Sequence, residues 1–136
     1  MMQRVTVPYR QQPGMMTPMP LVDVRLSHDD RNIQATALID SGAMISLLPF
    51  EYGRQLGFSS DDQRVEVRLG GILHGVKAFA VIAHVHIQPL PQVKLVFAWA
   101  EQTGRPVPLV FGQINFFKQF RVDFMGKDDC FFLSLI

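Results

Sequence analysis

One aspartate stands inside an apolar stretch of the chain. The segment A-L-I-D-S-G-A-M-I-S-L-L-P, residues 37–49, places Asp40 between two apolar runs. Desolvating an unpaired carboxylate costs several kcal/mol or more. The sequence therefore predicts that Asp40 either lies at a turn in contact with water or is compensated by another group. A carboxylate in such a setting is chemically useful, because it can act as a base on water.

The tripeptide Asp40-Ser41-Gly42 is a weak signal when it is taken alone. At average residue usage, an Asp, a Ser or Thr and a Gly in succession occur in roughly one chain in fifteen of this length. Such a tripeptide is also typical of an Asx-type turn at the end of a strand. The chemical interpretation therefore depends on what the rest of the chain builds around it.

A second candidate for chemistry is the pair His84 and His86. Residues two apart on a strand share one face, as metal ligands can. No cysteine or acidic residue lies near them in the sequence to complete a ligand set. We expect a half-exposed strand face here, with no metal and no cofactor.

The elements around Asp40 are predicted to be short strands. Residues 21–26 and 33–39 alternate apolar and polar side chains, which is typical of a hairpin, and its second strand ends at Asp40. Pro49 opens a short predicted helix. Further strands are predicted at residues 3–8, 65–69, 76–87, 93–100, 108–112, 120–124 and 130–136. This pattern indicates a mostly-β barrel or sandwich with one or two short helices.

Length and composition indicate one domain with a hydrophobic core. The chain has 136 residues, 48% of them apolar, and a net charge of +1 without a basic stripe, so nucleic-acid binding is not indicated. Residues 1–20 read as an extended N-terminal arm or linker, because residues 10–20 hold three prolines and a glycine, and residues 21–136 read as the domain. A single cysteine, no signal-like segment and no apolar run of membrane length lead us to expect a cytoplasmic protein without membrane association.

Three segments in order give the chain a family resemblance. L-I-D-S-G-A resembles the active-site loop of the retropepsins, the single-domain aspartic proteases, and the longer string with its later Ser46 and Pro49 is similar to the cellular and bacterial branch. L-G-G-I-L-H-G-V-K, from residue 69, is similar to the glycine-rich flap of that family. P-L-V-F-G-Q-I-N-F-F, from residue 108, resembles the family's second landmark. The resemblance extends from residue 21 to about residue 124.

The resemblance implies a fold and an activity. The fold would be all-β, a closed retropepsin-like β-barrel protomer with one or two short helices. The activity would be that of an aspartic endopeptidase acting on protein or peptide substrates. Because the chain holds one such triad, activity would require a homodimer with two-fold symmetry, in which two Asp40 carboxylates share one proton and activate a water.

The resemblance also assigns supporting roles in the catalytic loop. Ser41 would bridge to the backbone of the opposing loop rather than act as a nucleophile. Gly42 would let the backbone approach the carboxylates closely. Ala43 stands where some relatives carry a hydroxyl residue that donates to the carboxylate.

Two further segments receive roles by the same resemblance. A mobile flap would cover an extended peptide, and its candidate residues are Leu69, Gly70, Gly71 and Ile72. Gly112 would pack behind the site, where a side chain would collide with the Asp40 strand.

One departure from the retroviral pattern concerns the dimer. Retroviral members carry an acidic residue and an arginine that brace the two protomers, and here those positions are Met44 and Gln113. Two alternatives remain open at the level of sequence. The chain could be a catalytically silent dimer of the same fold that binds extended peptides, or an unrelated β-barrel that binds a small ligand and uses Asp40-Ser41-Gly42 as a turn.

Overall fold

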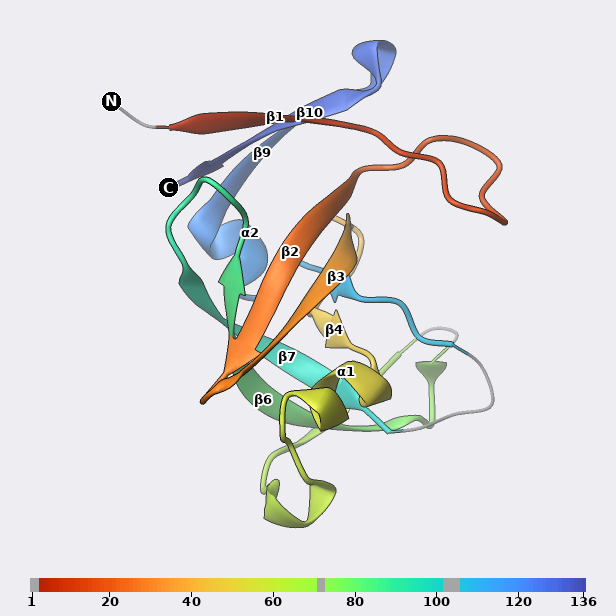
Figure 1. The fold of residues 1–136 in the computed structure, drawn as a ribbon. Helices are drawn as coiled ribbons and strands as arrows, with labels where there is room; N and C mark the ends of the chain where they lie inside the picture. The colour runs from red at the N-terminus through yellow and green to blue at the C-terminus, as the bar shows by residue number, and fades with distance from the viewer. Residues whose placement is uncertain (1–2, 71–72, 102–105) are drawn as a thin grey trace.

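The protein is described by a computed structural model that covers residues 3–70, 73–101 and 106–136. Strands dominate and only short helices occur in these ranges (Figure 1). The elements are β1 Arg4–Pro8, β2 Leu21–His28, β3 Arg31–Ile39, β4 Leu47–Leu48, α1 Phe50–Gln55, η1 Ser60–Asp62, β5 Glu66–Arg68, β6 Lys77–His86, β7 Val93–Ala100, β8 Val110–Phe111, α2 Phe116–Gln119, β9 Phe120–Met125, η3 Gly126–Asp128 and β10 Cys130–Leu135. The predicted mostly-β architecture with short helices is confirmed.

The larger sheet carries the end of the strand that leads to Asp40. Its strand order is β2-β3-β8-β4-β7-β6-β5, and β2 also pairs with β6, so the pairings return to their starting strand. The predicted hairpin is confirmed as antiparallel β2 and β3, in register from Leu21 opposite Leu38 to His28 opposite Arg31. β3 then continues into a short parallel pairing with β8. This pairing brings the Asp40 segment next to the second sequence landmark.

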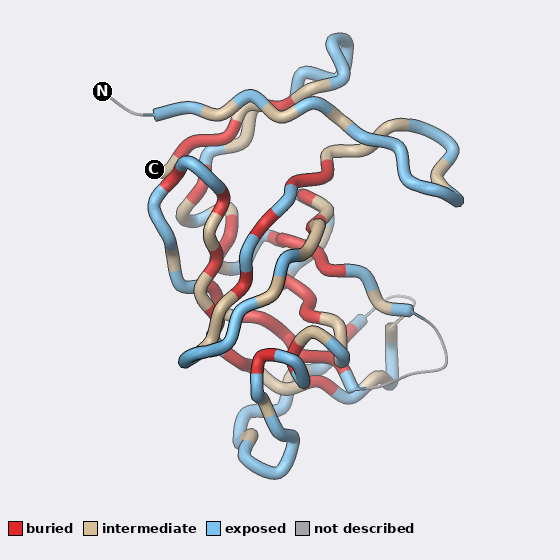
Figure 2. The backbone as a smooth tube through the Cα atoms, viewed as in Figure 1, coloured by how far each residue is buried: buried red, intermediate tan, exposed pale blue. Residues whose placement is uncertain are grey.

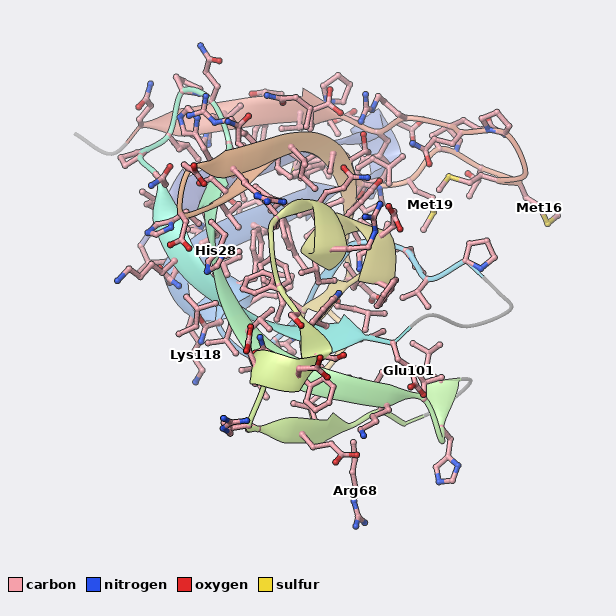
Figure 3. All side chains as sticks on the ribbon, turned by 60° about the horizontal axis from the view of Figure 1, so that its bottom comes forward. Met16, Met19, His28, Arg68, Glu101 and Lys118 are labelled. Atoms are coloured by element: carbon pink, nitrogen blue, oxygen red, sulfur yellow. The ribbon has the colours of Figure 1, made fainter. Side chains whose placement is uncertain are left out.

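A smaller sheet with the order β1-β10-β9 lies at the top of the molecule in Figure 1. The strand predicted at residues 3–8 is β1, and it pairs antiparallel with β10. Between β1 and β2 the chain makes an excursion that is closed by a bridge between Arg10 and Met19. Met16 lies at the tip of this excursion (Figure 3). Its side chain is 99% exposed.

The main hydrophobic core consists mostly of leucine, valine and phenylalanine side chains, and five phenylalanines are among its largest fully buried members. Buried backbone segments run through the interior of the molecule (Figure 2). Phe111, Phe116 and Phe120 stack in sequence, with ring centroids 4.6 Å apart at each step. All three side chains are buried. The stack holds α2 against the end of β8, close to the loop that follows β3.

Helix α1 contains a glycine that lowers its helix propensity but is required for its packing. Gly53 has low helix propensity, but a Cβ at this position would overlap the buried Trp99 indole. The same indole donates its Nε1–H to the Phe50 carbonyl at 3.0 Å. Close packing on Trp99 therefore outweighs helix propensity here.

Across the described ranges, no helix has the length and hydrophobicity required to cross a membrane.

The N-terminal excursion is held to β2 by a charged cluster that should make stability depend on pH. The Arg10 guanidinium donates to both Asp23 carboxylate oxygens, at 2.7 and 3.2 Å, and the Thr36 hydroxyl donates at 2.9 Å. The Arg10 hydrogen bond lowers the pKa of Asp23 below its ordinary value. A lowered pKa in the folded state stabilises the fold. This stabilisation is complete above the pKa of the unfolded state and is lost as pH falls through the pKa of the folded state.

We therefore predict a small pH-dependent difference between the parent and Asp23→Asn. At neutral pH the parent should have the larger free energy of unfolding, by at most about 1 kcal/mol, because Asp23 is largely exposed and solvent screens the pair. The difference should shrink as pH falls through the lowered pKa of Asp23 in the folded state. Urea unfolding of both proteins at each pH measures it, and an equal difference at neutral and acidic pH would contradict the role of Arg10.

Candidate active site

Asp40 lies at a turn that begins where β3 ends, and its side chain is half-buried. Its backbone N–H donates to the Phe111 carbonyl at 3.0 Å, which continues the β3–β8 pairing by one residue. Its Oδ1 accepts the Gly42 N–H at 2.9 Å, and its carbonyl accepts the Ala43 N–H at 3.1 Å. Both solutions expected for an aspartate in an apolar run are therefore present, a turn with access to water and a compensating donor.

The loop after Asp40 is fastened to the segment that follows β8. The Gln113 N–H donates to the Ala43 carbonyl, and the Ile114 N–H donates to the Met44 carbonyl, both at 2.8 Å. The Gln113 side-chain amide donates to the Ser41 carbonyl at 2.6 Å. Three hydrogen bonds from two adjacent residues therefore fix the position of the loop. We refer to residues 112–114 as the strap.

Gly112 lies where the strap comes close to the loop that follows Asp40. A Cβ on Gly112 would lie 2.7 Å from the Ala43 carbonyl oxygen and 2.8 Å from the Ile45 carbonyl oxygen. These are backbone atoms, which cannot rotate out of the way as a flexible side chain could. The Gly112 N–H donates to the Ser46 hydroxyl at 3.0 Å, and Ser46 is fully buried.

Two residues of this arrangement were missed by the sequence reasoning. Ser46 was noted only as part of the resemblance, and its signal was a lone hydroxyl between apolar neighbours, which needs a partner when it is buried. Gln113 was read only as the absence of an arginine. Its amide contact to Ser41 has no signature in the sequence, because it joins residues 72 positions apart.

A small apolar cluster connects the loop that follows Asp40 with the predicted flap. Its buried members are Leu47, Leu69, Ala78, Ala98, Ala100 and Val110, and half-buried residues packed against it include Leu38, Ala43, Ile45, Leu73 and Val76. Leu69 belongs to this cluster, whereas Gly70 is exposed with open space around it. The other two predicted flap residues, Gly71 and Ile72, lie outside the described residues.

A groove of about 660 Å³ begins beside the same strand end. Its lining includes Leu38, two residues before Asp40, together with Phe50, Leu109 and two carboxylates, Glu51 and Glu101. Glu51 pairs with Arg54. The groove thus offers apolar and acidic surface beside the end of β3, and neither Asp40 nor the loop that follows it is part of its lining.

The histidine pair does not form part of this site. His86 Nδ1 lies 3.3 Å from the Arg25 guanidinium across the β2–β6 pairing. Among the residues that the structure describes, no group of three or more His, Cys, Asp or Glu side chains gathers in a way that could hold a metal ion.

Comparison of the sequence with family models and with curated proteins finds no match. Comparison of the structure finds a crystal structure of a retropepsin-like aspartic protease from Rickettsia conorii, with a TM-score of 0.68 and 16% identity, over 99% of this chain and 93% of that chain. It also finds EIAV protease in complex with an inhibitor, with a TM-score of 0.54 and 16% identity, over 71% of this chain and 84% of that chain. The chain therefore has the fold of the retropepsin-like aspartic proteases.

Proposed function

We propose that the chain is an aspartic endopeptidase that hydrolyses peptide bonds with a dyad of two Asp40 carboxylates, one from each protomer of a homodimer. The observation that carries the proposal is the placement of Asp40 within a retropepsin-like fold. Its carboxylate accepts the Gly42 N–H at a turn, and the strap fastens the loop around it. Residues 21–136 would form the catalytic domain, a closed β-barrel, and residues 1–20 an arm.

The chemistry follows from bringing two such carboxylates together. Like charges about 3 Å apart cannot both ionise, so the pair holds one proton. The ionised carboxylate takes a proton from a water, whose oxygen attacks the peptide carbonyl carbon, while the protonated carboxyl donates to the carbonyl oxygen. The carboxyl that took the water proton then gives it to the amide nitrogen, and the C–N bond breaks. A hydroxyl of the tetrahedral intermediate returns a proton to the other carboxylate as the carboxylic acid product forms.

The surrounding residues support this reaction in distinct ways. The Gly42 N–H donates to Oδ1 of Asp40 and so orients this carboxylate. Ser41 and Ala43 shape the loop, and we assign to the Ser41 hydroxyl the bridge to the opposing protomer. Leu69 and Gly70, with Gly71 and Ile72 next to them, would close over an extended peptide by main-chain hydrogen bonds. Gly112 holds the strap against the loop.

A peptide library incubated with the purified protein tests the proposal, with cleavage products identified by mass spectrometry. Endopeptidase activity yields paired fragments from internal bonds. Saturable binding of peptides without fragments would instead identify a silent peptide-binding protein and would overturn the enzymatic proposal.

A shared dyad also predicts that activity depends on protein concentration. Activity per protomer should fall on dilution, because one Asp40 cannot hold both the base and the acid role at once. We expect the fall in specific activity to follow the dissociation of dimers measured by light scattering over the same dilution series. Specific activity that stays constant while the protein becomes monomeric would contradict a site shared between protomers.

A further inference from the structure

The groove beside β3 follows one edge of that strand. Gln34, Ala35 and Thr36 all line it, and they are consecutive in the chain. Successive side chains of a strand point to opposite faces, so a cavity that touches three residues in a row lies along the edge, where the backbone is. We call this cavity of about 660 Å³ the edge groove. Residues 49–52, at the start of α1, also line it.

The backbone of β3 presents hydrogen-bonding groups to the edge groove. The Leu38 N–H donates to the Leu109 carbonyl at 3.0 Å, on the side of β3 that faces β8. Backbone groups alternate between the two sides of a strand, so Thr36 and Gln34, at steps of two from Leu38, direct their N–H and C=O groups to that same side. β8 pairs with β3 only at Leu38 and Ile39, and no other strand of the described ranges covers this side. A strand that enters the groove therefore meets unpaired backbone.

The lining of the edge groove is apolar and acidic. Much of it is apolar: Leu21, Leu38, Phe50, Val107 and Leu109. Its charged side chains are two exposed carboxylates, Glu51 and Glu101, and no lysine or arginine of the described residues belongs to it. Arg54 pairs with Glu51 from outside the lining, and one Glu101 oxygen accepts the Lys77 N–H at 3.0 Å. A basic side chain in the groove therefore meets complementary charge.

We propose that the edge groove binds an extended segment of another protein as a strand added to β3, with apolar and basic side chains in alternation. Main-chain hydrogen bonds to Gln34 and Thr36 supply affinity, and the apolar and acidic lining selects the side chains on the two faces of the added strand. Gln12 and Met15 of the N-terminal excursion also line the groove. With α1 they flank the open edge, which favours a single segment over the broad sheet of a second copy. The site does not involve Asp40 and goes beyond the proposed peptidase activity.

The first experiment tests the backbone contact. The probe is a short fluorescein-labelled peptide of alternating valine and lysine, and fluorescence anisotropy follows its binding to Asp40→Asn, so that cleavage cannot interfere. Adding Gln34→Pro removes the N–H that faces the groove, a change that a strand edge tolerates because this N–H is not part of the β2 pairing. Asn32→Pro is the matched control, because Asn32 lies on the same side of β3 but does not line the groove. We expect Gln34→Pro to weaken binding by about tenfold and Asn32→Pro to leave it unchanged.

A second measurement needs no change to the strand. Two versions of the peptide carry N-methyl groups on alternate residues, in the two possible registers, and each version lacks the N–H donors along one of its edges. Binding should fall by about tenfold for one version and persist for the other, because an added strand uses one edge only.

The charge of the groove is tested separately. Glu101→Gln removes a carboxylate and keeps an oxygen that can accept the Lys77 N–H. It should weaken binding of the lysine peptide by up to about fivefold at about 0.1 M salt, and the difference should vanish at about 1 M salt. Glu66→Gln, an exposed position on β5 outside the groove, should bind as the parent does. A peptide of alternating valine and glutamate should bind about tenfold more weakly than the lysine peptide.

The outcomes separate this inference from the proposed function. Unchanged binding to a Gln34→Pro variant that circular dichroism shows to be folded, or equal binding of both N-methylated peptides, would overturn the added strand. Equal affinity for the lysine and glutamate peptides would overturn the basic occupant. Self-association that Gln34→Pro abolishes and the peptide reverses would identify a second copy in the groove and also overturn the proposal. A protein that binds the peptide as expected but never cuts peptides would support the inference and contradict only the proposed function.

Discussion

Asp40→Asn should abolish peptide cleavage and leave the fold intact. The amide has no charge at neutral pH and cannot take a proton from water, so both the base and its shared proton are lost from the dyad. A loss of about 10⁴-fold in kcat/KM is expected, the upper range of what general acid–base groups contribute. Stability should change little, because the remaining oxygen of the amide can accept the Gly42 N–H that Oδ1 accepts in the parent.

The matched control is Asp30→Asn, an equivalent change at an exposed turn position between β2 and β3. It should retain the activity and the unfolding midpoint of the parent. If Asp40→Asn, shown to be folded by circular dichroism, cuts the peptide library at the rate of the parent, Asp40 is not the catalytic group.

Mixing Asp40→Asn with the parent tests whether the dyad is shared between protomers. When Asp40→Asn is added in large excess to the parent, most parent protomers pair with an inactive partner. Activity per parent protomer should then fall in proportion to the parent's mole fraction, because the fraction of all pairs that are parent–parent is the square of that mole fraction. An enzyme with its complete site on one chain would keep its activity per parent protomer unchanged.

The strands were predictable because their side chains alternate on a half-buried surface. Residues 21–26 and 33–39 have the period of two that one buried face requires, and the structure pairs them as β2 and β3. The two-residue strand β4 could not be located in this way, whereas β8 falls within the strand predicted at residues 108–112. A strand of two residues has no period, and its partners lie far away in the sequence.

The key residue of the candidate site could be predicted from the sequence, but the arrangement of the residues around it could not. Asp40 stood out because a charge in an apolar run needs an explanation, and the structure provides one in the turn and the Gly42 N–H. The strap contacts made by Gln113 and Ser46 depend on long-range pairing of β3 with β8. Sequence patterns describe local periodicity, so contacts that arise only when distant strands meet remain outside their reach.

Gly112→Ala should damage both stability and activity, because the added methyl group has no space. Its carbon would lie 2.7 to 2.9 Å from backbone atoms of Ala43 and Ile45, which are held by the strap. Either the strap or the catalytic loop must move. Overpacking of this kind costs typically about 1–3 kcal/mol in the free energy of unfolding. A displacement of the loop by about 1 Å would cost about 10²-fold in catalysis, because the two carboxylates must meet at a defined separation.

Gly126→Ala provides the comparison for this change. Gly126 lies in η3 with open space around its Cα, so the same methyl group meets nothing within 4 Å there. We expect the unfolding midpoint and kcat/KM of Gly126→Ala to match the parent, while both fall for Gly112→Ala when urea unfolding and peptide cleavage are measured at one temperature. If Gly112→Ala lowers stability alone, the strap yields and the catalytic loop keeps its place. If neither quantity changes, the close approach of the strap to Ala43 and Ile45 is not what fixes the loop, and the position of Asp40 must depend on the β3–β8 pairing and the Gln113 amide instead.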